Sequence, residues 1–517
     1  MPSSAGERSV AQQMLVMLSD HGVRQVFGLP GVHNLAFWDS EVGPTIIGVR
    51  HEQTAGYAAD GVSRATGGLG VALTTTGPGA MNVLAAFGEA AVSHASILVI
   101  ASDVSTSLRR PEPRGILHEM RDQAAAFAPL ASRDAHGRPM AWNCATAEEA
   151  LRALDAALHR HQSFGEVAAF IGVPTDVLSE VAVELPHSPG SPNADEHAIE
   201  IASILQESQR PVIWMGGGAA ALCDRPDGSH VLRTFVERLG APVVTSFAGR
   251  GVLANHPHVV EAPIHEPEVH ALLTEADCLV VLGSDFDGMN TRNWRVPVPS
   301  SIVTINHALE PIHTNLPQAV HYTGDLEALS AVTASLAPRD PWRDVSDIAQ
   351  AMRARLRSDA RGTSGMHLVD CIESAWPADA HVTVDMCVAG YWIAGYMAQP
   401  RPRRLAYPVG WGTLGFALPA AIGPASAGTP TLAVCGDGGA MFALGELATY
   451  VQEHLPITLL LHDDGGYGML RFDQQVFGHP ERGVDLETPD WCSLAASFGI
   501  PAREADLNTL HDALAWA

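Results

Sequence analysis

Short apolar runs alternate with longer amphipathic segments along the chain, and the two differ in the spacing of their apolar positions. Runs that stay apolar at nearly every position indicate strands buried on both faces of a sheet. The longer segments 55–67, 80–94 and 440–454 predict helices between strands. The predicted strands are 25–31, 45–52, 70–79, 96–103, 211–219, 242–250, 278–286, 301–307, 381–386, 431–439 and 457–466.

Strands that alternate with helices predict parallel sheets covered by helices on both faces. The three groups of strands therefore predict an α/β protein of three doubly wound parallel-sheet domains, at residues 1–184, 197–335 and 345–517. Polar segments rich in proline, at 185–197 and 336–344, are the predicted linkers. Ligands of such sheets bind beyond the carboxyl ends of the strands, so the polar residues there are the candidate site residues.

Composition narrows the choice of partners and compartment. The 517 residues carry a formal net charge of −26 and include no lysine. The negative charge makes nucleic acid and membrane surfaces unfavourable partners. The missing lysine excludes a lysine Schiff base and a Walker P-loop. The seven cysteines form no C-x-x-C pair and the N-terminus lacks a signal-peptide pattern, so we expect a cytoplasmic protein.

Two aspartates follow neighbouring predicted strands near the C-terminus. Asp437 lies in the turn Cys-Gly-Asp-Gly-Gly, and Asp464 is the second residue of an Asp-Asp pair. A glycine turn that leads into a helix suits a phosphate, but an aspartate there repels phosphate unless a cation lies between them. Because Mg²⁺ binds carboxylates together with phosphate oxygens, we predict a magnesium–diphosphate site at Asp437, Asp464 and the carbonyl of Gly466. Aspartates that only form turns are the alternative.

This segment resembles a known family. Residues 436–469 look like the thiamine diphosphate (ThDP) binding motif, which begins Gly-Asp-Gly and ends in Asn-Asn. The segments VFGLPG, RHEQTAGYAADGVSRATG, TTGPGAMN and GTLGFALPAAIG resemble the acetolactate synthase and 2-oxo-acid decarboxylase superfamily, in the family's order. The resemblance implies ThDP and Mg²⁺ as cofactors. The middle domain of some members binds FAD, which the residues here leave undecided and a yellow colour of the purified protein would reveal.

The resemblance also assigns roles around the cofactor. Glu52, in Arg-His-Glu, matches the glutamate that hydrogen-bonds N1′ of the aminopyrimidine; an exposed glutamate at a helix start is the alternative. Leu414 matches the aliphatic residue that separates the two cofactor rings; a core leucine is the alternative. The further cofactor contacts that the resemblance implies are Thr76, Gly77, Gly410, Gly412, Gly436, Gly438 and Gly439.

The residues that the resemblance places near the substrate include two histidines and an aspartate. Val32 and His33 lie in a loop that faces the reacting centre in the family, and His118 stands where acetolactate synthases typically carry glutamine. We predict that His33 and His118 act in catalysis, as proton donor or substrate ligand, with surface histidines as the alternative. Phe472-Asp473 replaces the usual Gln-Trp. Asp473 is our hypothesis for a group facing a cationic substrate tail, as in a guanidino-2-oxo acid.

The activity implied by the resemblance is decarboxylation of a 2-oxo acid, through an enamine intermediate, to an aldehyde. The alternative is an acetolactate synthase-type carboligase that joins the same intermediate to a second carbonyl compound. The resemblance further implies a homodimer or homotetramer, with Glu52 from one subunit and the diphosphate site from another.

Three departures from the family keep a binding-only homologue open. Asp463-Asp464 replaces Asn-Asn, the segment 387–390 (Cys-Val-Ala-Gly) replaces Gly-Gln-His-Gln, and the chain ends before the family's usual C-terminal segment. A nicotinamide-dependent oxidoreductase also stays open, because residues 410–415 match G-x-G-x-x-G.

Overall fold

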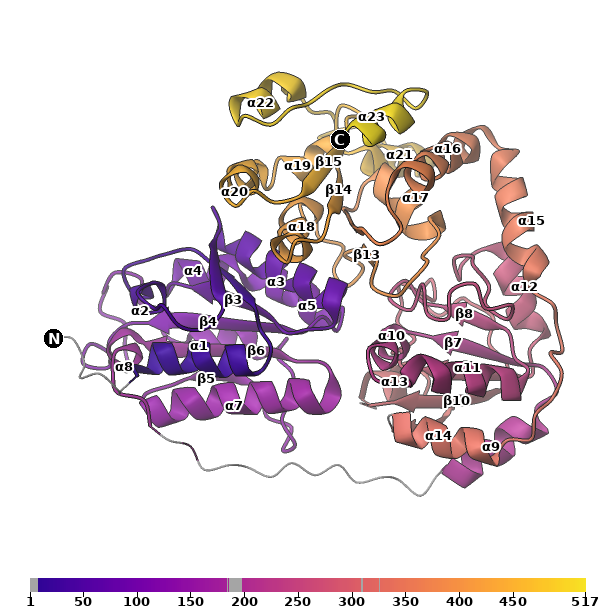
Figure 1. Cartoon of the computed structure of the whole chain (residues 1–517), viewed down its shortest axis with the longest axis horizontal. Helices are drawn as coiled ribbons and strands as arrows, with labels where there is room; N and C mark the ends of the chain where they lie inside the picture. The colour runs from indigo at the N-terminus through magenta and orange to yellow at the C-terminus, as the bar shows by residue number, and fades with distance from the viewer. Residues whose placement is uncertain (1–7, 184, 186–197, 308–309, 325) are drawn as a thin grey trace. The chain divides into compact units, whose positions relative to one another are not determined.

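The computed structural model describes residues 8–183, 185, 198–307, 310–324 and 326–517, and it contains three sheets with helices around each (Figure 1). The chain divides into two compact units. The first holds the N-terminal and C-terminal sheets, and the second holds the middle sheet. The three parallel α/β sheets that the sequence predicts are confirmed.

The N-terminal sheet has six strands in the order β2-β1-β3-β4-β6-β5, all paired in parallel. Helices α1 and α7 cover one face, and α3 and α5 pack against the other (Figure 1). The strands are β1 (Gln25–Gly28), β2 (Thr45–Gly48), β3 (Gly70–Thr74), β4 (Ile97–Asp103), β5 (Ala141–Asn143) and β6 (Ala168–Pro174). The helices are α1 (Val10–Asp20), α2 (Leu35–Trp38), α3 (Glu52–Thr66), α4 (Pro78–Asn82), α5 (Leu84–Val92), α6 (Gln123–Phe127), α7 (Ala147–Phe164) and α8 (Thr175–Leu178).

The middle sheet has five strands in the order β11-β10-β9-β7-β8, also parallel. Its strands are β7 (Pro211–Met215), β8 (Val243–Thr245), β9 (Cys278–Leu282), β10 (Ser301–Asn306) and β11 (Val320–Thr323). The helices in this part of the chain are α9 (Ala198–Glu207), α10 (Gly217–Cys223), α11 (Gly228–Leu239), α12 (Pro267–Glu275), α13 (Glu310–Asn315), α14 (Leu326–Ser335) and α15 (Ser346–Arg357).

The C-terminal sheet has the order β13-β12-β14-β15, and β12, β14 and β15 pair in parallel. Its strands are β12 (His381–Val384), β13 (Leu405–Ala406), β14 (Thr431–Gly436) and β15 (Ile457–His462). The helices in this part of the sequence are α16 (Ala360–Ala375), α17 (Val388–Tyr396), α18 (Ala417–Ser426), α19 (Asp437–Ala440), the 3₁₀ turn η1 (Leu444–Glu446), α20 (Leu447–Gln452), α21 (Gly468–Val476), α22 (Trp491–Ser497) and α23 (Leu510–Trp516), of which α16, most of α17 and α23 belong to the second compact unit.

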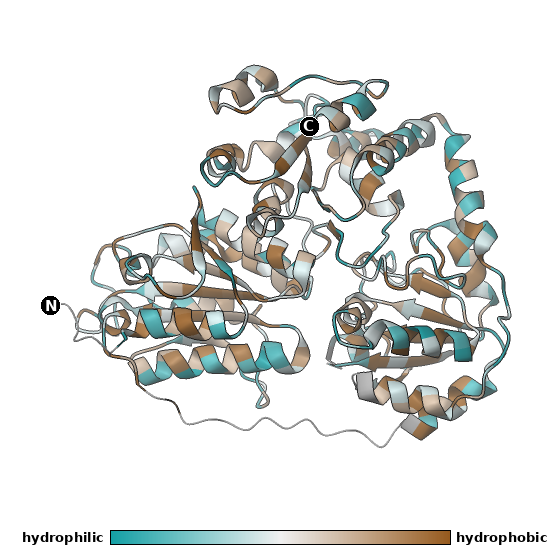
Figure 2. Cartoon of the chain, viewed as in Figure 1, coloured by the Kyte–Doolittle hydropathy of each residue, from teal (hydrophilic) through white to brown (hydrophobic). Residues whose placement is uncertain are grey.

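Strands and helices divide the apolar residues as their periods require. The central strands are brown along most of their length in Figure 2, whereas helices such as α7 and α11 alternate brown and teal. The strands β3, β4, β7 and β9 are buried at every position. Among the described residues, none of the helices combines the length and the hydropathy that crossing a bilayer requires.

All eleven predicted strands exist, but the helix predicted at 440–454 is wrong as a single element. The chain there forms the end of α19, a turn, η1 and α20, because Gly445 interrupts the helical pattern. Most of the linker 185–197 lies outside the described residues. The linker 336–344 has no helix or strand, yet Trp342 anchors it by donating to the carbonyl of Pro211 at 2.8 Å. The three domain boundaries stay predictions.

Helices α3 and α18 pack closely enough to require glycine. A Cβ on Gly61 would strike the carbonyl of Ala420, and a Cβ on Gly423 would strike the carbonyl of Ala58. The backbones of the two helices are therefore in direct contact, which only residues without a side chain permit. This contact holds α3, the helix that begins with Glu52, against the C-terminal part of the same compact unit.

Candidate active site

Glu52 begins helix α3, and its carboxylate is buried. Only 7% of the residue is exposed. His51 caps the helix, because its Nδ1 accepts a hydrogen bond from the backbone N–H of Gln53 at 3.1 Å. Oε2 of Glu52 accepts a hydrogen bond from Nδ2 of Asn82 at 3.0 Å. The alternative of a solvent-exposed glutamate at a helix start is therefore wrong.

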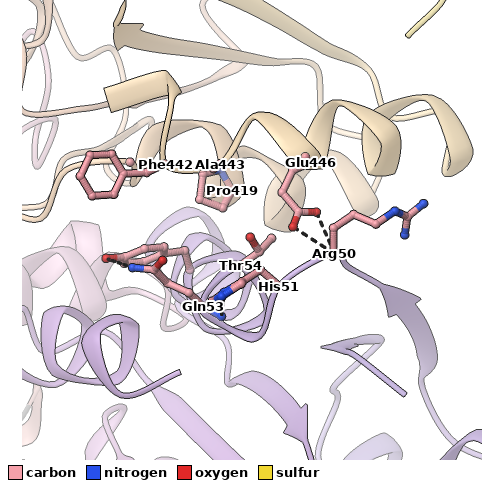
Figure 3. A pocket seen from close by; sticks show the side chains of 11 residues that line it. Arg50, His51, Gln53, Thr54, Pro419, Phe442, Ala443 and Glu446 are labelled. Carbon is pink, nitrogen blue, oxygen red and sulfur yellow. Dashed lines mark hydrogen bonds between the residues drawn. The ribbon is translucent and has the colours of Figure 1, made fainter. Parts of the chain in front are cut away.

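The backbone that leads into Glu52 is held by a second buried glutamate. Both carboxylate oxygens of Glu446 accept the backbone N–H of Arg50, at 3.0 and 3.2 Å, as Figure 3 shows. A pocket of about 240 Å³ opens beside this contact, and its walls include His51 and Phe442 (Figure 3). The start of α3 is thus fixed by side chains from distant parts of the sequence.

Two loops that carry histidines meet near the carboxyl edge of the N-terminal sheet. The ring centroids of His33 and His118 lie 5.4 Å apart. Nδ1 of each ring is buried without a hydrogen-bond partner in the described part of the chain. Burial and the neighbouring His118 lower the pKa of His33, against the opposing effect of Asp103. His33 is therefore neutral at pH 7 and can accept a proton. Val32, beside it, is 78% exposed.

Glycines let the loops around Glu52 approach one another. A Cβ on Gly79 would lie 3.2 Å from Oε1 of Glu52. Gly77 has a φ of +64°, and a Cβ there would strike the carbonyl of His118. Thr76, which precedes Gly77, has no exposed surface. The predicted residues Glu52, Thr76, Gly77 and His118 therefore gather around the turn that follows β3.

Asp437 and Asp464 follow the paired strands β14 and β15. Asp437 is 1% exposed, and burial raises the pKa of its carboxyl, with a further contribution from the charge of Asp464. Oδ2 of Asp437 and Oδ1 of Asp464 are buried and have no hydrogen-bond partner among the described residues. Two neighbouring carboxylate oxygens without partners are costly unless a cation lies between them.

The loop that follows β15 is braced on both sides. Gly466 pairs with Asp485 in an antiparallel bridge. The guanidinium of Arg471 donates to the carbonyls of Asp464 and Gly465, at 3.3 and 3.1 Å. The backbone around the predicted carbonyl ligand is therefore held in one shape.

Asp463, the first residue of the Asp-Asp pair, holds the same loop. Its Oδ2 accepts from Nε1 of Trp491 at 2.7 Å and from Oγ1 of Thr488 at 3.1 Å, and its Oδ1 accepts from the N–H of Gly465 at 3.1 Å. Burial acts to raise the pKa of Asp463, but these hydrogen bonds outweigh burial and lower it. Three donors suit a carboxylate, whereas asparagine offers one acceptor oxygen.

Asp385 links two of the predicted cofactor segments. Its Oδ2 accepts from the N–H of Gly415 at 2.9 Å, and a Cβ on Gly439 would lie 2.6 Å from the same oxygen. Burial raises the pKa of Asp385 to about 6, although backbone N–H groups such as that of Met386 oppose the shift. Residues 410–415 and 436–439 therefore lie next to each other.

In the stretch 410–415, two backbone N–H groups already donate hydrogen bonds to a carboxylate. Glu89 accepts from the N–H of Gly410 at 3.0 Å and from the N–H of Trp411 at 2.9 Å. A dinucleotide pyrophosphate requires such N–H groups, and the charge of Glu89 would repel it. The nicotinamide alternative for this stretch is therefore wrong. Leu414 is half-buried, and its role between the cofactor rings stays a prediction.

The predicted residues thus form two sets: Glu52, His33 and His118 by the N-terminal sheet, and Asp437 and Asp464 by the C-terminal sheet. Within the described ranges, no hydrogen bond or ion pair joins Glu52, His33 or His118 to Asp437 or Asp464. Each set is organised by its own buried contacts.

Three family models match successive parts of this chain. The N-terminal TPP binding domain of thiamine pyrophosphate enzymes matches residues 8–126, their central domain matches 199–333, and their C-terminal TPP binding domain matches 385–517. The chain belongs to the thiamine pyrophosphate enzymes. Thiamine pyrophosphate is ThDP, so the resemblance and the prediction of a ThDP-dependent lyase or transferase are confirmed.

Individual relatives of this thiamine pyrophosphate enzyme cover nearly its whole length. A probable 2-ketoarginine decarboxylase of Pseudomonas aeruginosa is 34% identical over 99% of this chain and 92% of its own. An acetolactate synthase of Bacillus subtilis is 28% identical over 95% of this chain and 87% of its own. The large subunit of acetolactate synthase isozyme 3 of Escherichia coli is 29% identical over 95% and 88%.

The two aspartates of this thiamine pyrophosphate enzyme fit a divalent cation. The partnerless oxygens of Asp437 and Asp464 are suited to Mg²⁺. A search of the described residues for three or more His, Cys, Asp or Glu side chains placed to hold a metal finds none. The predicted site has two carboxylates and the carbonyl of Gly466, and would take its remaining ligands from phosphate and water.

The segment 387–390 of this thiamine pyrophosphate enzyme contributes no side-chain charge to that site. Sγ of Cys387 accepts a hydrogen bond from the N–H of Gly390 at 3.3 Å. Burial, followed by the charge of Asp385, raises the pKa of the Cys387 thiol to about 12, so the thiol is neutral at pH 7. Only the backbone N–H groups of this segment can therefore attract a phosphate.

Sequence reasoning missed Glu89 and Asp385 in this thiamine pyrophosphate enzyme. Glu89 stands alone among apolar residues in the predicted helix 80–94, and Asp385 lies near the end of the predicted strand 381–386. A single carboxylate in an apolar helix is the signal that was available, because such a group is buried only with partners.

We expect the Asp463→Asn variant to bind ThDP in saturating Mg²⁺ about 3- to 10-fold more weakly than the wild type. One of the three donors is left without its acceptor, so the loop that carries Asp464 loosens. Isothermal titration of the apoprotein measures this, with Thr488→Val as a control that removes one donor only. Tighter binding by Asp463→Asn would instead mean that removal of the negative charge outweighs removal of the hydrogen bond.

Proposed function

We propose that this enzyme decarboxylates a 2-oxo acid to an aldehyde, with ThDP and Mg²⁺ as cofactors, within a homodimer or a pair of homodimers. The observation that carries the proposal is the pair of buried, partnerless carboxylate oxygens at Asp437 and Asp464, at the ends of neighbouring strands. In a chain that belongs to the thiamine pyrophosphate enzymes, this pair supports a divalent cation bound to the diphosphate.

The proton chemistry of the proposal falls on Glu52 and the histidines. Bound ThDP supplies an electron sink for the carbanion that remains when CO₂ departs. Because Asn82 donates to Oε2 of Glu52, Oε1 is the oxygen left to carry a proton toward the aminopyrimidine. Neutral His33 can accept a proton at Nδ1, and the ring of His118 lies beside it, with 5.4 Å between the ring centroids. The burial of Glu52 keeps water from this exchange.

Two observations support a substrate with a cationic tail. The relative with 34% identity is a probable 2-ketoarginine decarboxylase. Asp473, on helix α21, makes no side-chain hydrogen bond or ion pair within the part of the chain that the structure describes, so its charge is available. We therefore propose that Asp473 faces a guanidinium or ammonium group of the substrate.

We expect the Asp473→Asn variant to lose about 3- to 10-fold in kcat/KM for a guanidino-2-oxo acid relative to a neutral branched 2-oxo acid. The reason is the loss of one attractive charge, which acts only on the cationic substrate. Competition between the two acids measures the ratio. Glu487→Gln, which removes one exposed carboxylate from the same part of the chain, is the matched control. An unchanged ratio would remove Asp473 from the proposal.

The subunit arrangement of the proposal rests on the two separate sets of residues. Glu52 would come from one protomer, and Asp437 and Asp464 from its partner. Exposed apolar side chains near both sets, including Val32 (78%) and Phe442 (54%), support a covering partner.

The experiment that tests the function is CO₂ release from a panel of pyruvate and of branched, aromatic, acidic and guanidino 2-oxo acids, with ThDP and Mg²⁺. Mass analysis of the products separates an aldehyde from a hydroxyketone, the product of the carboligase alternative. Release that requires both cofactors supports the proposal. A chain that binds ThDP but releases no CO₂ from any acid would favour the binding-only alternative.

A further inference from the structure

Helices α3 and α5 carry a buried cluster of charged side chains outside both sets of site residues. Arg64 pairs with Asp60, with 2.6 Å between Nε and Oδ1, and with Glu89, with 3.1 Å between Nη2 and Oε1. The Asp60 and Glu89 side chains have no exposed surface, and that of Arg64 is 12% exposed. A buried ion cluster of this kind adds little net stability, so its contacts call for a functional explanation.

The contacts of Glu89 lead to one loop. Besides the N–H groups of Gly410 and Trp411, Glu89 accepts a hydrogen bond from Oγ1 of Thr413 at 3.4 Å. Arg64 reaches the same segment, because its Nη1 donates to the carbonyl of Tyr407 at 2.7 Å. The cluster therefore hydrogen-bonds to both ends of the segment 407–413.

Residues 407–413 pack closely against Glu89 and its neighbours on α5. A Cβ on Gly410 would lie 2.5 Å from Oγ of Ser93 and 3.1 Å from Oε1 of Glu89, and a Cβ on Gly88 would strike the indole of Trp411. Burial acts to raise the pKa of Glu89, but Arg64 and the N–H groups of the loop outweigh burial and lower it. Glu89 is thus a full negative charge at pH 7, and the loop amides are arranged around it.

We propose that Glu89 is a positioning residue for the cofactor: its carboxylate, braced by Arg64, holds residues 410–413 in the shape that receives the aminopyrimidine ring. The inference rests on the proposed function and on the contacts of Gly410 and Gly412 with ThDP that the family resemblance implies. Glu89 itself does not touch the cofactor. It uses the amides of Gly410 and Trp411 to set the path of the loop, as a second layer of contacts supports a binding site.

Asp60 offers a matched control for Glu89. Each carboxylate pairs with Arg64, but only Glu89 contacts residues 410–413. Glu89→Gln and Asp60→Asn therefore remove the same kind of charge from Arg64, and only the first also releases the loop.

The test is the affinity of the full-length apoprotein for ThDP, and separately for inorganic diphosphate as a competitor, both in saturating Mg²⁺. We expect Glu89→Gln to weaken ThDP binding by about 10-fold or more and to leave diphosphate binding unchanged, because diphosphate lacks the pyrimidine ring. Asp60→Asn should bind both ligands nearly as the wild type does. If Glu89→Gln does not fold, Glu89→Asp replaces it, since it keeps the charge for Arg64 and withdraws the carboxylate from the loop.

Equal loss of ThDP affinity in the Glu89 and Asp60 variants would overturn the inference, because it would reveal a role in stability alone. A parallel loss of diphosphate binding in Glu89→Gln would overturn it in the same way, as would unchanged ThDP binding. A wild-type protein that does not bind ThDP would overturn the proposed function itself, and this inference with it.

Discussion

The Glu52→Gln variant is expected to release CO₂ about 10³-fold more slowly than the wild type while binding ThDP with nearly the same affinity. Glutamine keeps the shape of the side chain and an oxygen for Nδ2 of Asn82, but it cannot carry a proton. Steady-state CO₂ release gives the rate, and isothermal titration gives the affinity. A lower rate of CO₂ release at an unchanged ThDP affinity would assign Glu52 to proton transfer rather than to cofactor binding.

A second buried carboxylate on α3 controls for simple destabilisation. Asp60→Asn also removes a buried carboxylate from this helix, where Asp60 accepts hydrogen bonds from Arg64 and, within the described residues, makes none to a predicted site residue. We expect this variant to retain most of the rate. If Glu52→Gln kept more than about a tenth of the wild-type rate, Glu52 would not be the proton-transfer group.

The Asp437→Ala variant is expected to lose Mg²⁺-dependent ThDP binding, with an affinity more than about 100-fold weaker. The substitution removes one of the two buried carboxylates that have an oxygen without a partner among the described residues, and with it one of the two negative charges proposed to bind the cation. Removal of Mg²⁺ from the wild type by a chelator should have a similar effect. Wild-type affinity in Asp437→Ala, or wild-type binding in the presence of chelator, would contradict a metal site at this turn.

Mixing the two inactive variants tests the arrangement of subunits. If each site takes Glu52 from one protomer and Asp437 from its partner, a mixed dimer of Glu52→Gln and Asp437→Ala has one intact site. An equal mixture should then regain about a quarter of the wild-type activity, because half of the dimers are mixed and each holds one working site of two. A site built within one chain would regain none.

The order of strands and helices was predictable because its signals are local. Buried strands such as β4 and β14 are apolar at every position, and glycine turns mark their ends. The strands that were not predicted are β5, β6 and β11. β5 and β11 are short and only partly buried, so their pattern is weak. β6 is fully buried, but its apolar run closely follows the long amphipathic helix α7.

The site was predictable only where a residue touches the cofactor in the family. Asp437 and Glu52 stand in motifs with fixed spacing, so they could be named from the sequence. Glu89 and Asp385 act through contacts with residues 321 and 30 positions away, respectively. Nothing in the local sequence specifies such partners, because tertiary packing alone decides which amide a buried carboxylate meets.

The length of helix α3 and its contact with α18 have a consequence for the geometry of the site. Its 15 residues span about 22 Å at 1.5 Å per residue, with Glu52 at one end and Arg64 at the other. Between them, Gly61 lies against the backbone of α18 and leaves no room to slide. The helix therefore acts as a rigid spacer that fixes the distance between Glu52 and the loop at Arg64.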